Sequence, residues 1–144
     1  MDKNNSIWRQ LQRNLIAIIS LAFAMTGLAY NTWRNEQTEE NRNVREATFE
    51  ILVKLGDLQR VVFFSHYDHD LLEGNPRSGW AYALTISDLS QVVPAPMPEC
   101  TSRLKETWGQ SWSDLGKDEQ SVQKIGSAID ECRDVALKIL RELR

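Results

Sequence analysis

The chain has 144 residues, of which 42% are hydrophobic and 26% are charged, and its formal net charge is −3. This size fits one domain, and this composition excludes an intrinsically disordered chain. The charge is uneven, because 14 basic and 19 acidic residues follow the first 30 residues. An acidic soluble part without a cluster of Lys and Arg argues against nucleic acid as a partner.

A long apolar segment lies near the N-terminus. The 20 residues between Arg13 and Arg34 carry no charge. Twenty helical residues span about 30 Å, which is the thickness of a bilayer's hydrocarbon core. We therefore predict a transmembrane helix over residues 15–33, a signal anchor in the lipid bilayer. It follows a short basic tail (residues 1–14) and precedes a polar juxtamembrane segment (residues 34–43).

Aromatic residues flank this segment. Trp8 precedes it, and Tyr30 and Trp33 close it. Aromatic rings favour the headgroup level of a bilayer, so these three residues are predicted membrane-interface anchors. A cleaved signal peptide is the main alternative, because basic residues precede the segment and Ala22–Ala24 or Gly27–Ala29 resembles a cleavage site. A buried core helix is a second alternative.

Residues 44–144 are predicted to form a helical bundle domain of about four helices. Heptad-like spacing predicts a long first helix, with its apolar stripe at Val44, Thr48, Ile51, Leu55, Leu58, Val62 and Ser65. A short second helix is expected to bury the row Tyr82, Ile86, Leu89 and Val93, beside Trp80 and Leu84. A short third helix carries Leu104, Trp108, Trp112 and Leu115. A long fourth helix carries Val122, Ile125, Ile129, Cys132, Ala136, Ile139 and Leu143.

Turn chemistry separates these helices. The segment Glu73–Pro76 should end the first helix, and Gly116 should end the third. The proline-rich segment Pro94–Pro98 is expected to exclude helix and to form an extended connector. The predicted fold class is all-α, with an antiparallel bundle whose two long helices extend beyond the two short ones as a coiled coil.

The two cysteines are predicted to form a disulfide. Cys100 and Cys132 each lie 16 residues from Gly116. In an antiparallel pair of helices, residues equidistant from the turn lie level, so the two thiols can meet. Such a bond would stabilise the fold by about 3–4 kcal/mol in the chain-entropy model. It requires an oxidising compartment; the alternative is two ordinary thiols, with Cys132 a small buried hydrophobe.

Two groups of residues are candidates for ligand binding. His66, His69 and Asp70 would lie one helical turn apart and could converge on a metal ion such as zinc. Polar residues are also expected where a helix ends in solvent. The three tryptophans Trp80, Trp108 and Trp112 could line a small-molecule pocket, although their spacing also fits a bundle core.

No catalytic motif is present, so we expect neither an enzyme nor a cofactor. We expect a membrane-anchored, non-enzymatic helical module that mediates protein–protein interaction, either by self-association into a homodimer or as an accessory subunit of a membrane complex. An extracytoplasmic small-ligand or metal-binding sensor subunit is the alternative. The expected location is the cell membrane, single-pass, with the N-terminus cytoplasmic and the bundle domain periplasmic. The disulfide and the compact basic tail favour this orientation.

Overall fold

The computed structural model describes residues 9–10 and 13–143, and it is all-helical over that range, with no strand. The elements are α2 (Leu15–Phe63), the π-helix η1 (Phe64–Asp68), α3 (Pro76–Leu89), α4 (Met97–Ser111) and α5 (Glu119–Glu142). Short 3-10 helices, η2 (Ser90–Val92) and η3 (Trp112–Asp114), follow α3 and α4. The predicted all-helical class is confirmed for the described residues, and so is the long apolar N-terminal helix.

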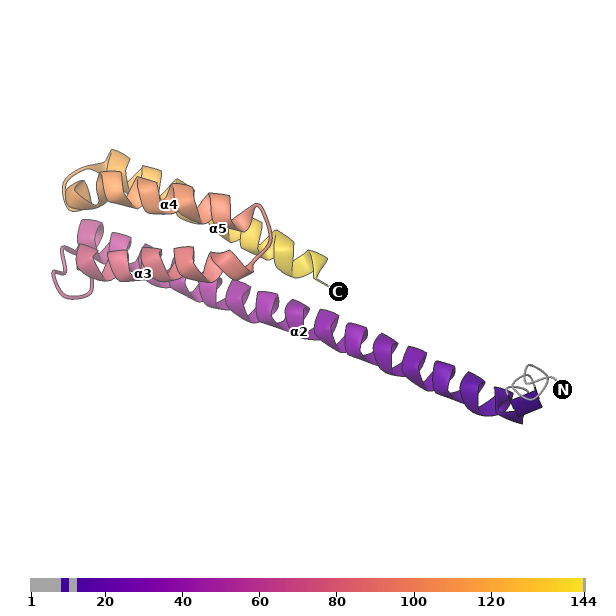
Figure 1. Ribbon diagram of the computed structural model, residues 1–144. Helices are drawn as coiled ribbons and strands as arrows, with labels where there is room; N and C mark the ends of the chain where they lie inside the picture. Colours follow the sequence, from indigo (N-terminus) through magenta and orange to yellow (C-terminus); the bar gives the residue numbers. More distant parts are fainter. Residues whose placement is uncertain (1–8, 11–12, 144) are drawn as a thin grey trace. The chain divides into compact units, whose positions relative to one another are not determined.

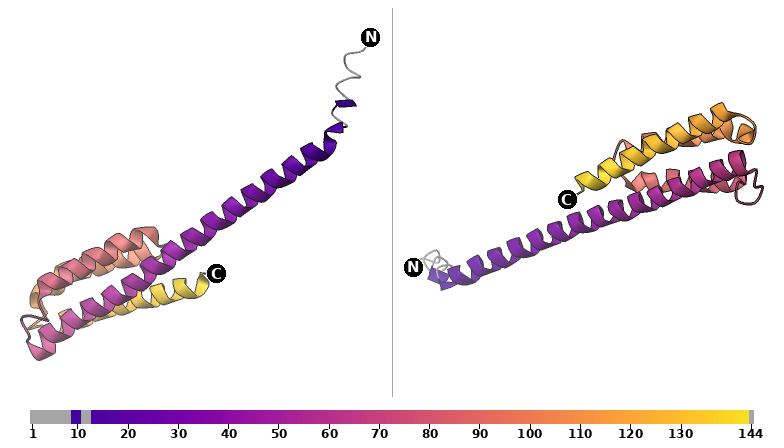
Figure 2. Two further views of the ribbon diagram at one scale, coloured as in Figure 1. Left: turned by 90° about the horizontal axis from the view of Figure 1, so that it is seen from below. Right: turned by 180° about the vertical axis from the view of Figure 1, so that it is seen from behind.

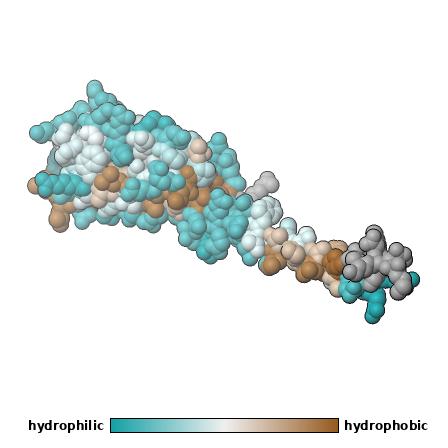
Figure 3. Space-filling view, in the orientation of Figure 1, coloured by the Kyte–Doolittle hydropathy of each residue, from teal (hydrophilic) through white to brown (hydrophobic). Residues whose placement is uncertain are grey.

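The chain divides into two compact units, an N-terminal unit (residues 1–40) and a helical domain (residues 41–144), and the division falls within α2. All described residues of the N-terminal unit are exposed. The one helix of the described residues that is long and apolar enough to cross a membrane begins in this unit. Its apolar surface is visible in Figure 3 as a brown and white segment.

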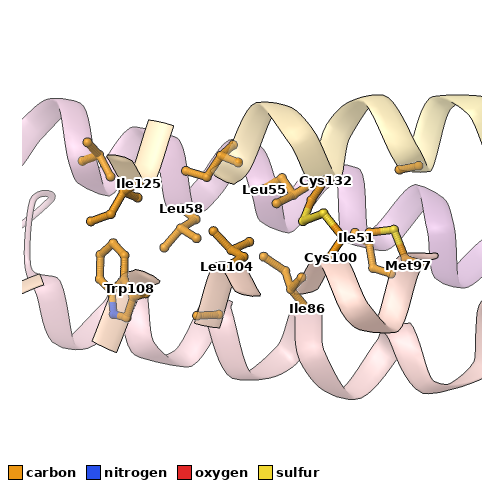
Figure 4. Close-up of a cluster of buried hydrophobic side chains, with 14 of the residues drawn as sticks. Ile51, Leu55, Leu58, Ile86, Met97, Cys100, Leu104, Trp108, Ile125 and Cys132 are labelled. Atoms are coloured by element: carbon orange, nitrogen blue, oxygen red, sulfur yellow. A yellow bond between two sulfur atoms is a disulfide. The ribbon is translucent and has the colours of Figure 1, made fainter. Parts of the chain in front are cut away.

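In the helical domain, the second half of α2 lies beside α3 and α5 (Figures 1 and 2). Helix α4 packs against both α3 and α5. The four helices share one buried core, part of which is drawn in Figure 4. The largest fully buried side chains include Ile51, Leu55, Leu58, Ile86, Met97, Leu104, Trp108, Ile125 and Ile129.

Helix α2 contributes the core stripe that its spacing predicts. Val44, Thr48, Ile51, Leu55, Leu58 and Val62 are all buried, whereas Ser65 is only half-buried in η1. Thr48 is the one polar member of this buried set. Its hydroxyl donates a hydrogen bond to the Val44 carbonyl oxygen at 2.6 Å, which satisfies the buried polar group.

The prediction for the buried face of α3 is confirmed at Ile86 and, just after the helix, at Val93, but it missed the small residues of this face. Helix α3 buries Gly79, Ala83 and Ile86, while Leu84 is exposed and Tyr82 only half-buried. Small residues form this face because Gly79 lies against Trp108 of α4. A Cβ atom at Gly79 would come within 2.1 Å of the Trp108 Cζ2 atom. The close approach of the two helices therefore favours small side chains over the larger apolar ones.

The connector between α3 and α4 is shorter than predicted. Helix α4 begins at Met97, and Pro98 lies in its first turn. Proline is tolerated there because the first turn of a helix has no partner for its backbone N–H groups. A buried hydrogen bond joins the end of α3 to α4, since the Thr101 hydroxyl donates to the Ser90 hydroxyl oxygen at 2.8 Å.

Helix α5 begins after Asp118, whose carboxylate accepts hydrogen bonds from the backbone N–H groups of Gln120 and Ser121. Its buried stripe agrees with the predicted one from Val122 to Ile139. One face of this 24-residue helix is buried along its length. The coiled-coil extension of the two long helices stays a prediction.

Candidate functional site

The two cysteines lie at disulfide distance in the core of the helical domain. Cys100 is in the first turn of α4 and Cys132 is in α5, and their Cα atoms are 5.6 Å apart. Figure 4 shows the bond between the two sulfur atoms among the side chains of Ile51 and Leu55. Both cysteines are at most 1% exposed. A reductant in solution therefore reaches this pair only when the surrounding helices open.

The structure does not bring the predicted metal ligands together. No group of three or more His, Cys, Asp and Glu side chains suited to a metal ion occurs among the described residues. The prediction assumed a regular helix, but the chain forms a π-helix over residues 64–68, and His69 has a left-handed backbone conformation with φ of 50°. His66 and Asp70 consequently form hydrogen bonds with different backbone groups and not with a shared ligand.

Both of these side chains hold the turn between α2 and α3. His66 Nδ1 lies 2.9 Å from the Leu115 carbonyl oxygen, which joins this turn to the one between α4 and α5. Asp70 Oδ1 accepts hydrogen bonds from the backbone N–H groups of Leu72 and Glu73, at 2.8 and 3.0 Å. These contacts give both residues a structural role in positioning the turn.

The structure places the three tryptophans at different depths. Trp108 is fully buried against Gly79, and its indole Nε1 has no hydrogen-bond partner among the described residues. Trp80 and Trp112 are half-buried at the edge of the core. Trp108 therefore belongs to the core of the helical domain, and a pocket between the three tryptophans stays a prediction.

An open groove of about 750 Å³ lies between α4 and α5, and no tryptophan lines it. Its lining is mostly amide and hydroxyl side chains, with Lys124 and Glu131 as the charged members. Glu131 forms an ion pair with Arg103 of α4. Small-molecule sites are usually enclosed and mostly apolar, and this groove is neither.

Two of the predicted membrane-interface residues lie on α2. Tyr30 and Trp33 are 61% and 60% exposed, and their ring centroids are 6.2 Å apart. Trp8 lies outside the described residues. Large apolar side chains from Leu15 to Leu28 are exposed throughout the apolar stretch, so nothing within the described chain covers them.

An exposed apolar row on α2 was not anticipated from the sequence. The outer row consists of Phe49, Val53, Gly56 and Phe63, at successive intervals of four, three and seven residues. These residues lie on the side of α2 opposite the buried core stripe. Phe49 and Val53 are each 55% exposed, and Phe63 is 47% exposed. The spacing itself was the available signal, but the stronger core stripe on the same helix obscured it.

Polar contacts to the neighbouring helices border the outer row. Toward α3, Lys54 lies over the ring of Tyr82, with Nζ 5.7 Å from the ring centroid. Toward α5, Arg133 donates a hydrogen bond to the side-chain oxygen of Gln59. The outer row therefore occupies the part of α2 that neither α3 nor α5 covers.

The charged groups around the outer row are paired within the chain. Lys54 Nζ lies 3.3 Å from Asp57 Oδ2 and 3.4 Å from Glu50 Oε1. The hydrogen bond to Asp57, with Glu50 nearby, raises the pKa of Lys54 above its usual value, so the ammonium stays charged. Arg60, in the interval between Gly56 and Phe63, forms an ion pair with Glu73 at 3.3 Å.

No protein-family model, curated protein sequence or solved structure matches the chain.

Proposed function

We propose that this protein is a membrane-anchored, non-enzymatic helical module that binds another protein through the outer row of α2. In this proposal, the apolar segment of α2 is a single-pass signal anchor with the N-terminus in the cytoplasm. The helical domain is an antiparallel four-helix bundle in the periplasm or an equivalent extracytoplasmic space.

Two features support the anchor and its orientation. The apolar segment is exposed and carries aromatic side chains at one end, as expected for a span in a bilayer. The buried pair of Cys100 and Cys132 lies at disulfide distance, and disulfides persist in oxidising compartments. The equal spacing of the two cysteines from Gly116 also supports the antiparallel pairing of α4 with α5.

The outer row is the observation that carries the binding function. Isolated exposed apolar residues are ordinary, but a row at heptad-like spacing on one helix face is typical of helix–helix contacts. Phe49, Val53 and Phe63 remain about half exposed although the domain has a complete core elsewhere. A partner that covers this row would remove apolar surface from water, which favours association.

Site-specific photo-cross-linking in membranes tests this proposal. A benzophenone-bearing amino acid replaces Val53 in the full chain, and the matched control carries it in place of Leu84. Leu84 is also an exposed apolar residue, but it lies on α3, outside the outer row. After irradiation of intact membranes, the position 53 variant should form a protein adduct, and the position 84 variant should not.

Equal adduct formation at both positions would show that the cross-links reflect random encounters. Absence of any adduct at position 53 would contradict a binding function for the outer row.

A further inference from the structure

We infer that the partner on the outer row is a second copy of this chain, with the two α2 helices packed in parallel about a two-fold axis. This inference rests on the proposed function, because it names the occupant of the same surface. Three features of the outer row carry it.

The first feature is Gly56, in the middle of the outer row. A Cβ atom at this position would meet nothing within 4 Å, so no contact within the described chain requires glycine there. Glycine in a helix interior costs roughly 0.5–1 kcal/mol relative to alanine. Its absent side chain lets another backbone approach closely, as a second helix does at a packed crossing. Gly56 thus favours a helical occupant.

The second feature is the spacing. Phe49, Gly56 and Phe63 recur every seven residues, and Val53 and Arg60 occupy the alternate positions four residues after Phe49 and Gly56. This alternation of three and four residues is that of the seam between two parallel helices. The N-terminal end of this part of α2 continues into the proposed anchor, so two copies in one membrane would present their α2 helices in the same direction.

The third feature is the charge. A two-fold interface places each residue close to its own copy, so unpaired charges on such a surface repel each other. Around the outer row, Lys54 is paired with Glu50 and Asp57, and Arg60 is paired with Glu73 of the same chain. These internal pairs reduce the repulsion between two copies, which makes the surface more compatible with itself.

The size of the outer row sets the strength of the contact. Stable interfaces bury about 800 Å² per partner and use about 20–30 residues a side. The outer row spans only two heptads, and two of its seam positions are Gly56 and the ion-paired Arg60. It therefore buries less area per partner than a stable interface, so the dimer should be weak in dilute detergent. Confinement of both anchors to one bilayer raises the effective concentration and favours the dimer there.

Energy transfer between two labelled populations of the purified full chain tests the inference. Both populations are reconstituted together in phosphatidylcholine vesicles at one surface density, and the transfer expected from random proximity at that density is the baseline. The wild-type chain should exceed this random level. Val53→Glu places like charges opposite each other and should reduce the transfer to the random level. The matched variant Leu84→Glu should leave it unchanged.

Wild-type transfer at the random level, or an equal effect of both substitutions, would overturn the inference. Co-expression of two differently tagged copies in the cross-linking experiment separates it from the proposed function. An adduct at position 53 that carries both tags supports the dimer. An adduct that contains a different protein overturns the dimer and leaves the binding function intact, whereas no adduct overturns both.

Discussion

The contact between Gly79 and Trp108 offers a quantitative test of the core. In Gly79→Ala, the new methyl group would lie 2.1 Å from Trp108 Cζ2 and 2.3 Å from Cη2. Carbon atoms in contact are about 3.5–4.0 Å apart, so the ring must move by roughly 1.5 Å. Trp108 is fully buried, so its ring can move only if neighbouring core side chains move with it. Overpacking of this kind costs about 1–3 kcal/mol.

Gly126→Ala is the matched control. Gly126 lies within α5, and a Cβ atom there would meet nothing within 4 Å. Both substitutions gain helix propensity of about 1 kcal/mol, so this gain cancels in the comparison. The free energy of unfolding of Gly79→Ala should therefore be lower than that of Gly126→Ala by about 1–3 kcal/mol, the overpacking cost.

Thermal unfolding followed by tryptophan fluorescence of the full chain in detergent measures this difference. For a domain of about 100 residues, each kcal/mol corresponds to about 4–8 °C in the midpoint. On the background of Trp108→Phe, which withdraws the outer part of the ring, Gly79→Ala should cost less, because the clash is relieved. Equal midpoints for Gly79→Ala and Gly126→Ala would refute the argument that α3 buries small residues to accommodate Trp108.

Four further predictions concern the disulfide, a helix cap, a core residue and the predicted metal ligands. Replacing Cys100 and Cys132 together by alanine should lower the free energy of unfolding by about 3–4 kcal/mol in denaturant titrations; no change would show that the pair contributes nothing to stability. Hydrogen bonds from Ser121, most of all from its side-chain hydroxyl, hold the pKa of Asp118 below its usual value. The stabilisation from this helix cap is therefore complete above the pKa that Asp118 has in the unfolded chain. It is lost as the pH falls through the lower pKa of the folded state. Asp118→Ala should accordingly melt below the wild type at pH 7, with the gap closing in acid, and a gap independent of pH would exclude this role. Ile129→Ala should cost about 2–5 kcal/mol, measured by denaturant unfolding, because Ile129 is fully buried; a loss below about 0.5 kcal/mol would mean that it lies outside the core. Zinc should leave the melting temperature of the chain unchanged. A zinc-dependent rise in melting temperature that His66→Ala abolishes would show that His66 binds the metal.

Much of the helical domain could be predicted from side-chain periodicity. The stripe on α5 was predicted residue by residue from Val122 to Ile139, because its large apolar residues lie on one face and its polar residues on the other. The core stripe on α2 was predicted for the same reason. In both helices, most of the buried residues are apolar and recur at helical spacing.

Periodicity failed where burial depends on a neighbouring helix. The buried face of α3 contains Gly79 and Ala83, which carry little hydrophobic signal, and their place is fixed by the ring of Trp108. Local pattern also gave no sign of the π-helix after Phe63, which separates the predicted metal ligands. That change of helix type brings His66 to the carbonyl oxygen of Leu115, 49 residues away in the sequence.

The candidate site was missed for a related reason. Helix α2 carries two apolar stripes, and a search for one amphipathic face finds the larger one. Only the burial of Ile51 and Leu55, together with the exposure of Phe49 and Val53, separates the stripe that packs internally from the outer row.

The most direct test of the account is the location and redox state of the helical domain in the cell. A reporter that is active only outside the cytoplasm is fused after Arg144, and the thiols of the chain are labelled with a maleimide before and after reduction. An exported domain with a disulfide should give an active reporter, with Cys100 and Cys132 labelled only after denaturation and reduction. An inactive reporter, with both thiols labelled after denaturation alone, would contradict the membrane orientation and the disulfide together.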